Sequence, residues 1–455
     1  MHRNLHHVSM VQQRIAELAR TKPELVFTSL VHYMPLDWLG EAYHHTRKDG
    51  AVGAVTGGEY GESLEENLQG LLDRLKSGRY RAPAVLRKEI PKGSDGETRP
   101  IGIPTFEDKI VQRAVVMLLE PIYEQDFYDG SYGFRPKRSA HDALQDVWDT
   151  TMAVSGGWVL EVDIRKFFDT LDHKQLQEFV SVRVRDGVVR RLIGKWLNAG
   201  VMAGQTVTYP DAGTPQGGVI SPLLANLYLH YVLDVKDVLP HMEGRSRLTR
   251  YADDFIIVFE KKRDAERVMS VLPKRMAKYG LTVHPDKTRL IDFRSPNHRE
   301  RCNNRNSPNS DSSRSSHLEP FDLLGFTHQW RKSQKGNWTV RRKTMSSRLT
   351  RSLNAIYQWC RTHRHCPVKE HWKHLCTQMR GHYGYYGIVG NAAALDMFHD
   401  QVARIWKKWL KRRNRKRDFN WEKFNRMRNG YRLPYPSEMR KTKKRPCSYT
   451  QLTLF

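Results

Sequence analysis

The residues with the clearest chemical potential are two adjacent aspartates, Asp253 and Asp254, which lie between two apolar runs. The pattern over 248–259 predicts a β-hairpin with its turn at 252–254. Because apolar strands on both sides imply burial, the two neighbouring charges would raise the pKa of one carboxyl group unless a cation neutralises them. Carboxylate oxygens without nitrogen ligands favour Mg²⁺. An exposed Asp-Asp turn, the alternative interpretation, would need no cation.

A third carboxylate, Asp163, follows the apolar run 158–162, which predicts a strand. An aspartate at a strand end and a pair at a hairpin tip could share two metal ions roughly 4 Å apart. One ion would activate an attacking hydroxyl group, and the other would stabilise the leaving group of a phosphoryl transfer. Asp169 and Asp172 are alternatives, but their place in the following turn favours helix capping.

The elements that position these carboxylates follow an α+β order. Short apolar runs predict strands over 84–92, 99–104 and 158–164. Apolar residues at helical spacing predict helices over 11–20, 63–77, 110–123, 174–199, 220–235, 264–279, 344–361 and 402–413. Between 293 and 321 the composition changes to Ser, Asn, Arg and Pro, which predicts a disordered insertion over about 295–319.

The charge of the chain points to a polyanionic partner. Lys and Arg number 76 against 49 Asp and Glu, which leaves a formal net charge of +27. About 18 of these basic residues and only 3 acidic ones fall in 401–455, so that segment alone carries roughly +15. Such a segment is typical of a nucleic-acid-binding tail. A merely basic or ribosomal-type protein is the alternative that composition leaves open.

Cysteine usage and hydropathy bear on the compartment. Five cysteines without a CxxC pair favour a reduced, cytoplasmic protein over a disulfide scaffold. The Cys and His residues of 360–366 match no zinc-finger spacing, so we expect an Arg/His-rich loop there. Residues 1–10 lack the apolar core of a signal peptide, and no apolar run approaches 18 residues. The sequence therefore predicts no membrane partner.

Several short blocks of the sequence, in one order along the chain, carry a more specific signal. The segment 251–254 (YADD) is similar to the YxDD signature of reverse transcriptases in general. Further blocks occur between about 64 and 400: IPK (90–92), RPIGIP (99–104), SYGFRP (131–136), GTPQGGVISPLLAN (213–226) and LLGF (323–326). By these blocks and their order, the chain resembles the group II intron reverse transcriptases. One YxDD motif is weakly specific, whereas this ordered series is strongly specific.

The resemblance implies a right-hand polymerase, an α+β fold with fingers and an antiparallel palm sheet, followed by a helical thumb and a basic helical tail. We expect an N-terminal extension over 1–62, fingers and palm over 63–328, a thumb or maturase domain over 338–400 and a DNA-binding tail over 401–455. The implied partners are a group II intron RNA, an RNA template with a DNA primer, target DNA and dNTPs.

The resemblance also assigns roles within the catalytic site. Asp163, Asp253 and Asp254 would bind two Mg²⁺ ions, with help from the Ile164 carbonyl group. Either Phe167 or Phe168 would pack under the sugar and exclude a 2′-hydroxyl group; the family's spacing slightly favours Phe168. The remaining predicted contacts of the incoming dNTP are Lys92, Arg99 and Gln216, of which the two cations would bind the triphosphate.

Predicted nucleic-acid contacts lie nearer the C-terminus. Exposed Tyr and Arg side chains can stack on unpaired bases and bind phosphates. For a tyrosine at a helix end, packing in a core is the alternative. The residues that we expect to contact RNA or DNA are Arg380, Tyr383, Tyr386, Lys407, Lys408, Lys411 and Arg412.

The sequence departs from the family's pattern in two places. Residues 51–56 (AVGAVT) lack the Asp of the family's usual run, so the function of that Asp is in doubt. No paired cysteines of an HNH nuclease follow the basic tail, so we expect no cleavage of the second DNA strand. Two alternatives to a polymerising maturase stay open: a splicing maturase that does not polymerise, and a reverse transcriptase recruited to host defence.

Overall fold

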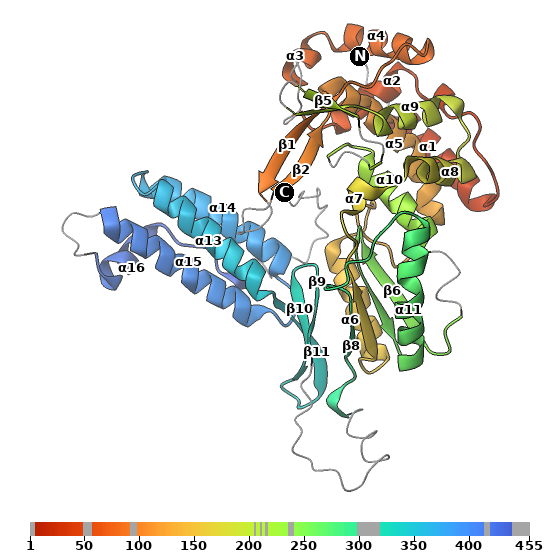
Figure 1. Ribbon diagram of the computed structural model, residues 1–455. Coiled ribbons are helices and arrows are strands. Elements are labelled where there is room, and N and C mark those ends of the chain that lie inside the picture. Colours follow the sequence, from red (N-terminus) through yellow and green to blue (C-terminus); the bar gives the residue numbers. More distant parts are fainter. Residues whose placement is uncertain are drawn as a thin grey trace. The chain divides into compact units, whose positions relative to one another are not determined.

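The computed structural model describes residues 5–48, 57–91, 98–203, 206–209, 212–213, 217–234, 241–297, 319–413 and 419–438. The chain divides into two compact units, 1–294 and 295–455, which are described here one at a time (Figure 1). The division falls at the beginning of the predicted insertion, whereas the predicted end of the fingers and palm is residue 328. Residues 298–318, the bulk of that insertion, lie outside the described residues.

An antiparallel sheet forms the lower half of the first unit. Its strand order is β6-β7-β3-β8, and every neighbouring pair is antiparallel. The strands are β6 (Ser246–Tyr251), β7 (Asp254–Phe259), β3 (Trp158–Val162) and β8 (Arg289–Asp292). All five residues of 255–259 are buried, as expected for an apolar strand that is covered on both faces. The predicted hairpin and the predicted strand before Asp163 are thus confirmed.

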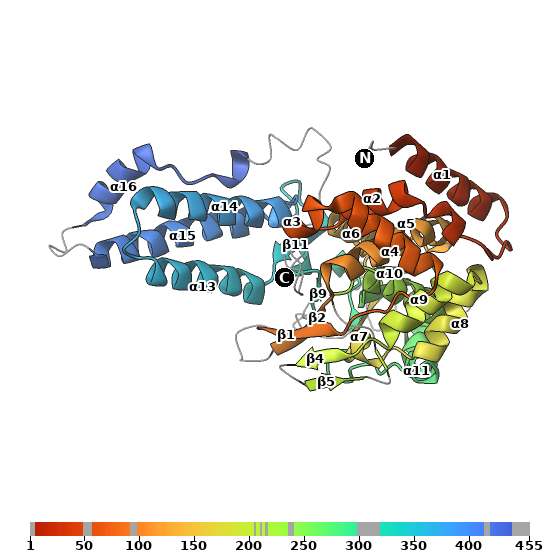
Figure 2. The same cartoon turned by 90° about the horizontal axis from the view of Figure 1, so that it is seen from above.

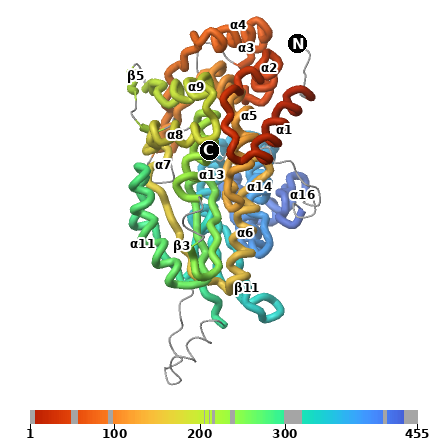
Figure 3. The backbone as a smooth tube through the Cα atoms, turned by 90° about the vertical axis from the view of Figure 1, so that its right-hand side faces the viewer, coloured from red at the N-terminus to blue at the C-terminus, as the bar shows by residue number. Residues whose placement is uncertain are grey.

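Two helices pack against this sheet. Helix α6 (Ala140–Ala153) contacts β6 and β7, and it begins with a capping box between Ser139 and Asp142. Helix α11 (Lys262–Lys278) runs beside β3, β7 and β8 and buries an apolar stripe that includes Val268 and Leu272 (Figure 3). The predicted helix over 264–279 is therefore confirmed.

The rest of the first unit surrounds a long buried helix, α5 (Phe106–Asp126), against which α1 and α2 pack. Its N-terminus is capped by the Thr105 hydroxyl group, which accepts from the backbone N–H of Asp108. The neighbouring helices are α1 (Leu5–Thr21), the short η1 (Val31–Tyr33), α2 (Leu36–His45), α3 (Gly57–Glu62) and α4 (Leu64–Lys76).

A second sheet contains the predicted basic hairpin. Its strand order is β2-β1-β4-β5, with β1 and β2 antiparallel over six residue pairs. The strands are β1 (Val85–Pro91), β2 (Thr98–Ile103), β4 (Val201–Ala203) and β5 (Thr206–Thr208). The connection 92–97 lies outside the described residues.

The prediction of a single helix over 174–199 is wrong. Two helices occupy it, α8 (His173–Arg183) and α9 (Gly187–Leu197). The helix breaks because Phe27 forms a bridge with Val184 and hydrogen bonds with the backbone on either side of it. Asp186 then caps α9 by accepting from two of its backbone N–H groups, while its other oxygen accepts from the N–H groups of residues 30 and 31.

The apolar segment 220–235 also differs from the prediction. It forms α10 (Ser221–Leu229), which continues directly into the π-helical turn η2 (His230–Asp234). A single helical turn, α7 (Phe167–Thr170), follows the strand that carries Asp163. Asp172 caps α8 by accepting from the backbone N–H of Gln175, as the sequence predicts for this residue.

In the described part of the second unit, a three-stranded sheet is accompanied by the helices named below. The sheet has the order β11-β10-β9 and consists of β9 (Phe321–Leu323), β10 (Phe326–Lys332) and β11 (Trp338–Thr344). The helices are α13 (Ser346–Thr362), α14 (Val368–Tyr386), α15 (Ala392–Arg413) and α16 (Trp421–Gly430). Figure 2 shows α13, α14 and α15 side by side.

Helix α15 runs across the predicted boundary at 400/401. Its second half buries Trp406, Trp409 and Leu410 in the core of the second unit. The basic segment therefore begins as part of a packed helix and not as a separate tail. None of the described helices is both long and apolar enough to span a membrane.

Candidate active site

The predicted catalytic turn is a two-residue connection between β6 and β7. Tyr251 pairs with Asp254, which leaves Ala252 and Asp253 as the turn. Ala252 has a φ of 58°, a left-handed conformation that is uncommon for a residue with a Cβ atom. Asp253 and Asp254 thus occupy the tip and the first strand position of the hairpin. Asp253 is partly exposed and Asp254 is exposed, whereas residues 255–259 are buried.

Asp163 lies at the same edge of the sheet as this turn. The last pair between β3 and β7 is Val162 with Phe255, so Asp163 and Asp254 are the next positions on the two strands. Neighbouring strands are about 5 Å apart. Asp163 and the adjacent pair Asp253 and Asp254, far apart in the sequence, therefore lie at one edge of the sheet. The next residue, Ile164, is buried and forms a bridge with Val283.

The electrostatics of this edge follow the sequence-based argument. Burial raises the pKa of Asp253, and the nearby Asp163 carboxylate raises it further. The cationic side chains of Arg99 and Arg250 act in the opposite direction. Asp163 is itself paired with a cation, since Lys287 Nζ lies 3.2 Å from its Oδ2. Cationic side chains thus lie near Asp163 and Asp253, whereas Asp254 is exposed.

The donor set of these aspartates matches the hard oxygen ligands that Mg²⁺ prefers. In the part of the chain that the structure describes, no three His, Cys, Asp or Glu side chains form a group that could hold a metal ion. The Lys287 ammonium group is paired with the Asp163 carboxylate, and Asp253 lies in the turn between β6 and β7. The ligand types fit, whereas ion binding would require these side chains to reorient.

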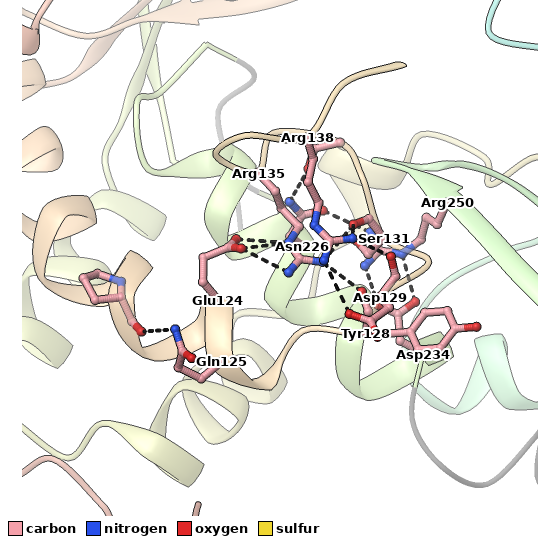
Figure 4. Close-up of polar contacts among 12 residues, drawn as sticks. Glu124, Gln125, Tyr128, Asp129, Ser131, Arg135, Arg138, Asn226, Asp234 and Arg250 are labelled. Carbon is pink, nitrogen blue, oxygen red and sulfur yellow. Dashed lines mark hydrogen bonds and ion pairs between the residues drawn. The ribbon is translucent and has the colours of Figure 1, made fainter. Parts of the chain in front are cut away.

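A buried arginine supports the turn from within the protein. Arg250, on β6, is fully buried. Its Nε and Nη2 donate to the two carboxylate oxygens of Asp234 at 2.9 and 2.5 Å (Figure 4). Its Nη1 donates to Asn226 Oδ1 at 3.0 Å and to the carbonyl oxygen of Ala252 at 3.2 Å. One guanidinium group therefore connects α10 and η2 to the left-handed residue of the turn.

A second support is the loop before Arg135. Asn226 Nδ2 donates to the Gly133 carbonyl oxygen at 2.7 Å. A Cβ atom at Gly133 would lie 2.3 Å from the backbone nitrogen of Ala252, so only glycine allows this approach. The backbone of Arg250 also exchanges hydrogen bonds with Gly130 and Tyr132. The loop thus packs directly on the peptide that precedes the predicted catalytic aspartates.

Sequence reasoning gave no role to Arg250, Asp234 or Asn226. The available signal was their polarity within apolar surroundings: Asn226 and Asp234 interrupt the apolar segment 220–235, and Arg250 directly precedes the YADD motif. Buried polar groups of this kind are rarely left without partners. Pairing them with one another, however, requires the tertiary structure.

The predicted nucleotide-binding residues are described only in part. Lys92 and Gln216 lie outside the described residues. Arg99 is exposed on β2, near enough to Asp253 for its charge to lower that pKa. Phe167 is buried in the core, whereas Phe168 is partly exposed, with the two ring centroids 5.3 Å apart.

Two glycines in the chain on either side of Gln216 lie close to elements that carry predicted nucleotide-binding residues. A Cβ atom at Gly213 would lie 2.9 Å from the carbonyl oxygens of Phe168 and Asp169, and one at Gly217 would lie 2.7 Å from that of Gly102. Both glycines have positive φ values, of 92° and 115°. Gly213 therefore lies against the α7 turn, and Gly217 lies against strand β2.

The predicted nucleic-acid contacts of the second unit fall into two groups. Tyr383 is buried against Phe398, which favours packing over base stacking and corrects the expectation for this residue. Tyr386 is partly buried beside Phe326. The side chains with solvent access are Arg380, Lys408, Lys411 and Arg412, with Lys407 partly exposed over the ring of Trp421.

Comparison with known proteins identifies the family. Residues 90–328, more than half of the chain, match the family described as reverse transcriptase (RNA-dependent DNA polymerase). The mixed α/β fold, with Asp163, Asp253 and Asp254 at one edge of a sheet, is consistent with a reverse transcriptase. The chain belongs to the reverse transcriptase family, and the matched region contains all three predicted catalytic aspartates.

Several relatives are similar over the same part of the chain. Protein YkfC of Escherichia coli is 39% identical over 234 residues, which cover 49% of this chain and 61% of that protein. The group II intron-encoded protein LtrA of Lactococcus lactis is 38% identical over 237 residues, covering 50% of this chain and 39% of LtrA. An uncharacterized 91 kDa protein in a cob intron of Schizosaccharomyces pombe is 39% identical over 160 residues, covering 35% of this chain and 20% of that protein. The matched segments thus span less than two thirds of these relatives.

Proposed function

We propose that the chain is an RNA-directed DNA polymerase encoded by a group II intron. The observation that carries the proposal is the position of Asp163 opposite Asp254 and beside the turn with Asp253, within the region that matches the family. The alternative that composition left open, a merely basic protein, accounts for the charge but not for three carboxylates at one sheet edge.

Asp163, Asp253 and Asp254, together with the Ile164 carbonyl group, would bind two Mg²⁺ ions. When bound, such ions supply electrostatic stabilisation of an in-line phosphoryl transfer. The protein's own groups bind and orient the substrates. Lys92 and Arg99 bind the triphosphate of the dNTP.

The sugar and base of the dNTP would contact residues of α7 and β2. The partly exposed ring of Phe168 excludes a 2′-hydroxyl group, and the buried Phe167 supports that ring from below. Gln216 lines the pocket, between two glycines that approach α7 and β2 closely. These roles divide the predicted residues between triphosphate binding and sugar selection.

The two units correspond in this proposal to the parts of a right-hand polymerase. The sheet with β6, β7 and β3 is the palm, the β1–β2 hairpin belongs to the fingers, and the helices of the second unit form the thumb. The exposed cations of the second unit, together with Tyr386, bind intron RNA during splicing, and the basic segment 401–455 binds target DNA. We place this activity in the cytoplasm because the cysteine pattern favours a reducing compartment.

The ion pair between Lys287 and Asp163 favours a second candidate, a maturase that binds RNA without polymerising DNA. In that case the ammonium group would neutralise Asp163 permanently. Ionised side chains at 3.2 Å are held mainly by electrostatics, so a divalent cation competes with the lysine. Primer extension separates the two candidates.

The proposal is tested by extension of a DNA primer on an RNA template with purified protein, dNTPs and Mg²⁺. We expect extension by the natural sequence and none by Asp253→Asn, because the substitution removes a ligand and leaves the RNA-binding surfaces intact. Binding of the template should be nearly equal for the two proteins. Absence of extension by the natural sequence, with template binding retained, would favour the non-polymerising maturase.

A further inference from the structure

The loop 131–138 beside the predicted catalytic turn alternates between buried and exposed residues. Gly133 and Arg135 are buried, whereas Phe134, Pro136 and Lys137 are exposed. Phe134 is 42% exposed, which is unusual for a large aromatic side chain next to a buried hairpin. The loop therefore presents an aromatic ring and an ammonium group three residues apart.

The backbone of this loop is strained at the two positions that present these groups. Phe134 has a φ of 56° and Lys137 a φ of 60°, both in the left-handed region. Bulky residues rarely adopt this conformation, because the Cβ atom approaches the carbonyl oxygen. Such a conformation persists where surrounding contacts impose it, and it is found preferentially at functional sites.

Between these two positions the loop is anchored by Arg135, which is 3% exposed. Its guanidinium group faces the carboxylate of Glu124, with Nε to Oε1 and Nη2 to Oε2 both at 3.0 Å (Figure 4). Its Nη1 also donates to the carbonyl oxygens of Tyr128 and Ser131, at 2.8 Å each. The buried arginine thus anchors the loop from below and fixes which side chains face outward.

The outward face of the loop lies next to the catalytic turn. The Phe134 ring centroid is 6.3 Å from that of Tyr251, the residue before the turn. Gly133 packs against the Tyr251–Ala252 peptide. Arg138 follows in the same loop, where its guanidinium group pairs with the Asp129 carboxylate at 3.4 Å and its guanidinium carbon lies 5.4 Å from the Tyr132 ring centroid.

We propose that Phe134 and Lys137 form a contact site for the primer–template duplex beside the catalytic turn. The inference rests on the proposed function, because it needs a duplex end at this turn. The Phe134 ring packs against a base or sugar of one strand, and the Lys137 ammonium group contacts a phosphate of that strand. Aromatic rings with neighbouring cations fit nucleic acid because every base has a π-face and every linkage a negative charge.

The test measures the dissociation constant of an RNA template annealed to a DNA primer, without dNTPs or Mg²⁺. We expect Phe134→Ala to weaken binding about fivefold or more, the smallest effect typical of a lost aromatic stacking contact. Phe134→Tyr keeps the ring and should bind within about twofold of the natural sequence. Lys137→Ala should reduce the slope of log K against log salt by about 0.7 to 0.9.

Matched controls come from α11, on the same unit. Met269 is 40% exposed and Lys274 is exposed, so Met269→Ala and Lys274→Ala remove an apolar side chain and a charge outside the proposed contact. Both should bind the duplex like the natural sequence. Equal binding by Phe134→Ala and Met269→Ala would overturn the proposal.

Phe134→Gly separates the contact from folding. Glycine tolerates a φ of 56°, so this variant should melt at a higher temperature while binding the duplex as weakly as Phe134→Ala. A higher melting temperature with unchanged binding would contradict the contact. Because binding is measured without synthesis, a natural sequence that binds through Phe134 but extends no primer would count against the proposed polymerase and not against this site.

Discussion

Two hairpins of the first unit contrast sharply, although both carry predicted catalytic-site residues. In β6–β7 the turn has two residues, residues 255–259 of the strand after it are buried, and a fully buried arginine contacts the turn. In β1–β2 only Val85 of the first strand is buried, and Arg99 on the second strand is exposed. The first hairpin is thus held by burial and by a side-chain hydrogen bond to its turn, whereas the second is held mainly by backbone hydrogen bonds between its strands.

The difference follows from what each hairpin has to do. Carboxylates that share metal ions need positions fixed within a fraction of an ångström, which a buried strand pair with internal hydrogen bonds provides. A cation that binds a triphosphate must admit and release it in each cycle, which an exposed strand allows. We therefore expect substitutions in β6–β7 to lower the rate of chemistry, and substitutions in β1–β2 to weaken nucleotide binding.

The largest effect should come from Asp163→Asn. The substitution removes a carboxylate from the edge that it shares with Asp254, so primer extension should fall below detection while duplex binding changes little. Single-nucleotide incorporation and duplex binding are measured on the same protein preparation. Incorporation at the natural rate would show that the palm edge does not perform the chemistry.

Arg250→Lys should have the next largest effect. Lysine cannot bridge Asp234, Asn226 and the turn in the planar geometry that the guanidinium group uses. Loss of a group that orients metal ligands typically costs about 10- to 100-fold in activity or metal affinity. We expect a lower maximal rate and a higher Mg²⁺ requirement, with an unchanged KM for the dNTP.

Arg247→Lys is the matched control for that prediction. Arg247 lies on the same strand but pairs with Asp146 of α6 and not with the turn. Its substitution should leave the Mg²⁺ dependence unchanged. If both variants lost rate without a shift in Mg²⁺ dependence, Arg250 would stabilise the fold without positioning the turn.

Arg99→Ala should affect binding more than rate. Loss of one charge-assisted contact should raise the KM for the dNTP about tenfold, with a smaller change in kcat. Arg87 is exposed on the neighbouring strand and pairs with Glu89, so Arg87→Ala is the control and should leave the KM unchanged. A pure loss of kcat in Arg99→Ala would remove the contrast between the two hairpins.

The smallest effect concerns stability and a third hairpin, β10–β11 of the second unit. Burial, together with a smaller effect of the nearby Arg342, lowers the pKa of His328, on β10, to about 3. Below pH 6.5 the unfolded chain therefore binds a proton that the folded chain does not. Stability should fall by about 1.4 kcal/mol per pH unit as the pH decreases from 6.5 toward 3.

His328→Phe should remove the contribution of this residue to the acid sensitivity and so reduce the total. Urea unfolding at pH 7.5 and 5.5 measures it, because the ring at this position stacks on Phe321 and cannot ionise in the variant. His365, which is exposed, serves as the control, and His365→Phe should keep the dependence of the natural sequence. An equal acid sensitivity of all three proteins would mean that His328 becomes protonated in the folded state.

Local patterns were sufficient to predict part of this molecule. The turn at 252–254 and the strand before Asp163 follow from apolar runs that end at charged residues, because both depend on near neighbours. The break between α8 and α9 could not be predicted in this way, since it depends on Phe27, far away in the sequence. Propensity favours one helix there, and the tertiary contact overrides it.

The candidate site shows the same division. Its carboxylates could be predicted because their residue types carry the chemistry. Arg250 was missed, since its partners come from α10 and η2 and meet it only in the folded chain. Tyr383 was assigned to RNA because an aromatic side chain in a helix has the same sequence pattern whether it packs in a core or stacks on a base.

The most direct test of the central claim is the anomalous scattering of Mn²⁺ in crystals of the protein with a primer–template duplex and a dNTP. We predict peaks for two ions roughly 4 Å apart, bound by oxygens of Asp163, Asp253 and Asp254, with Lys287 displaced from Asp163. Peaks elsewhere in the protein, or an Asp163 that stays paired with Lys287 and binds no ion, would contradict it.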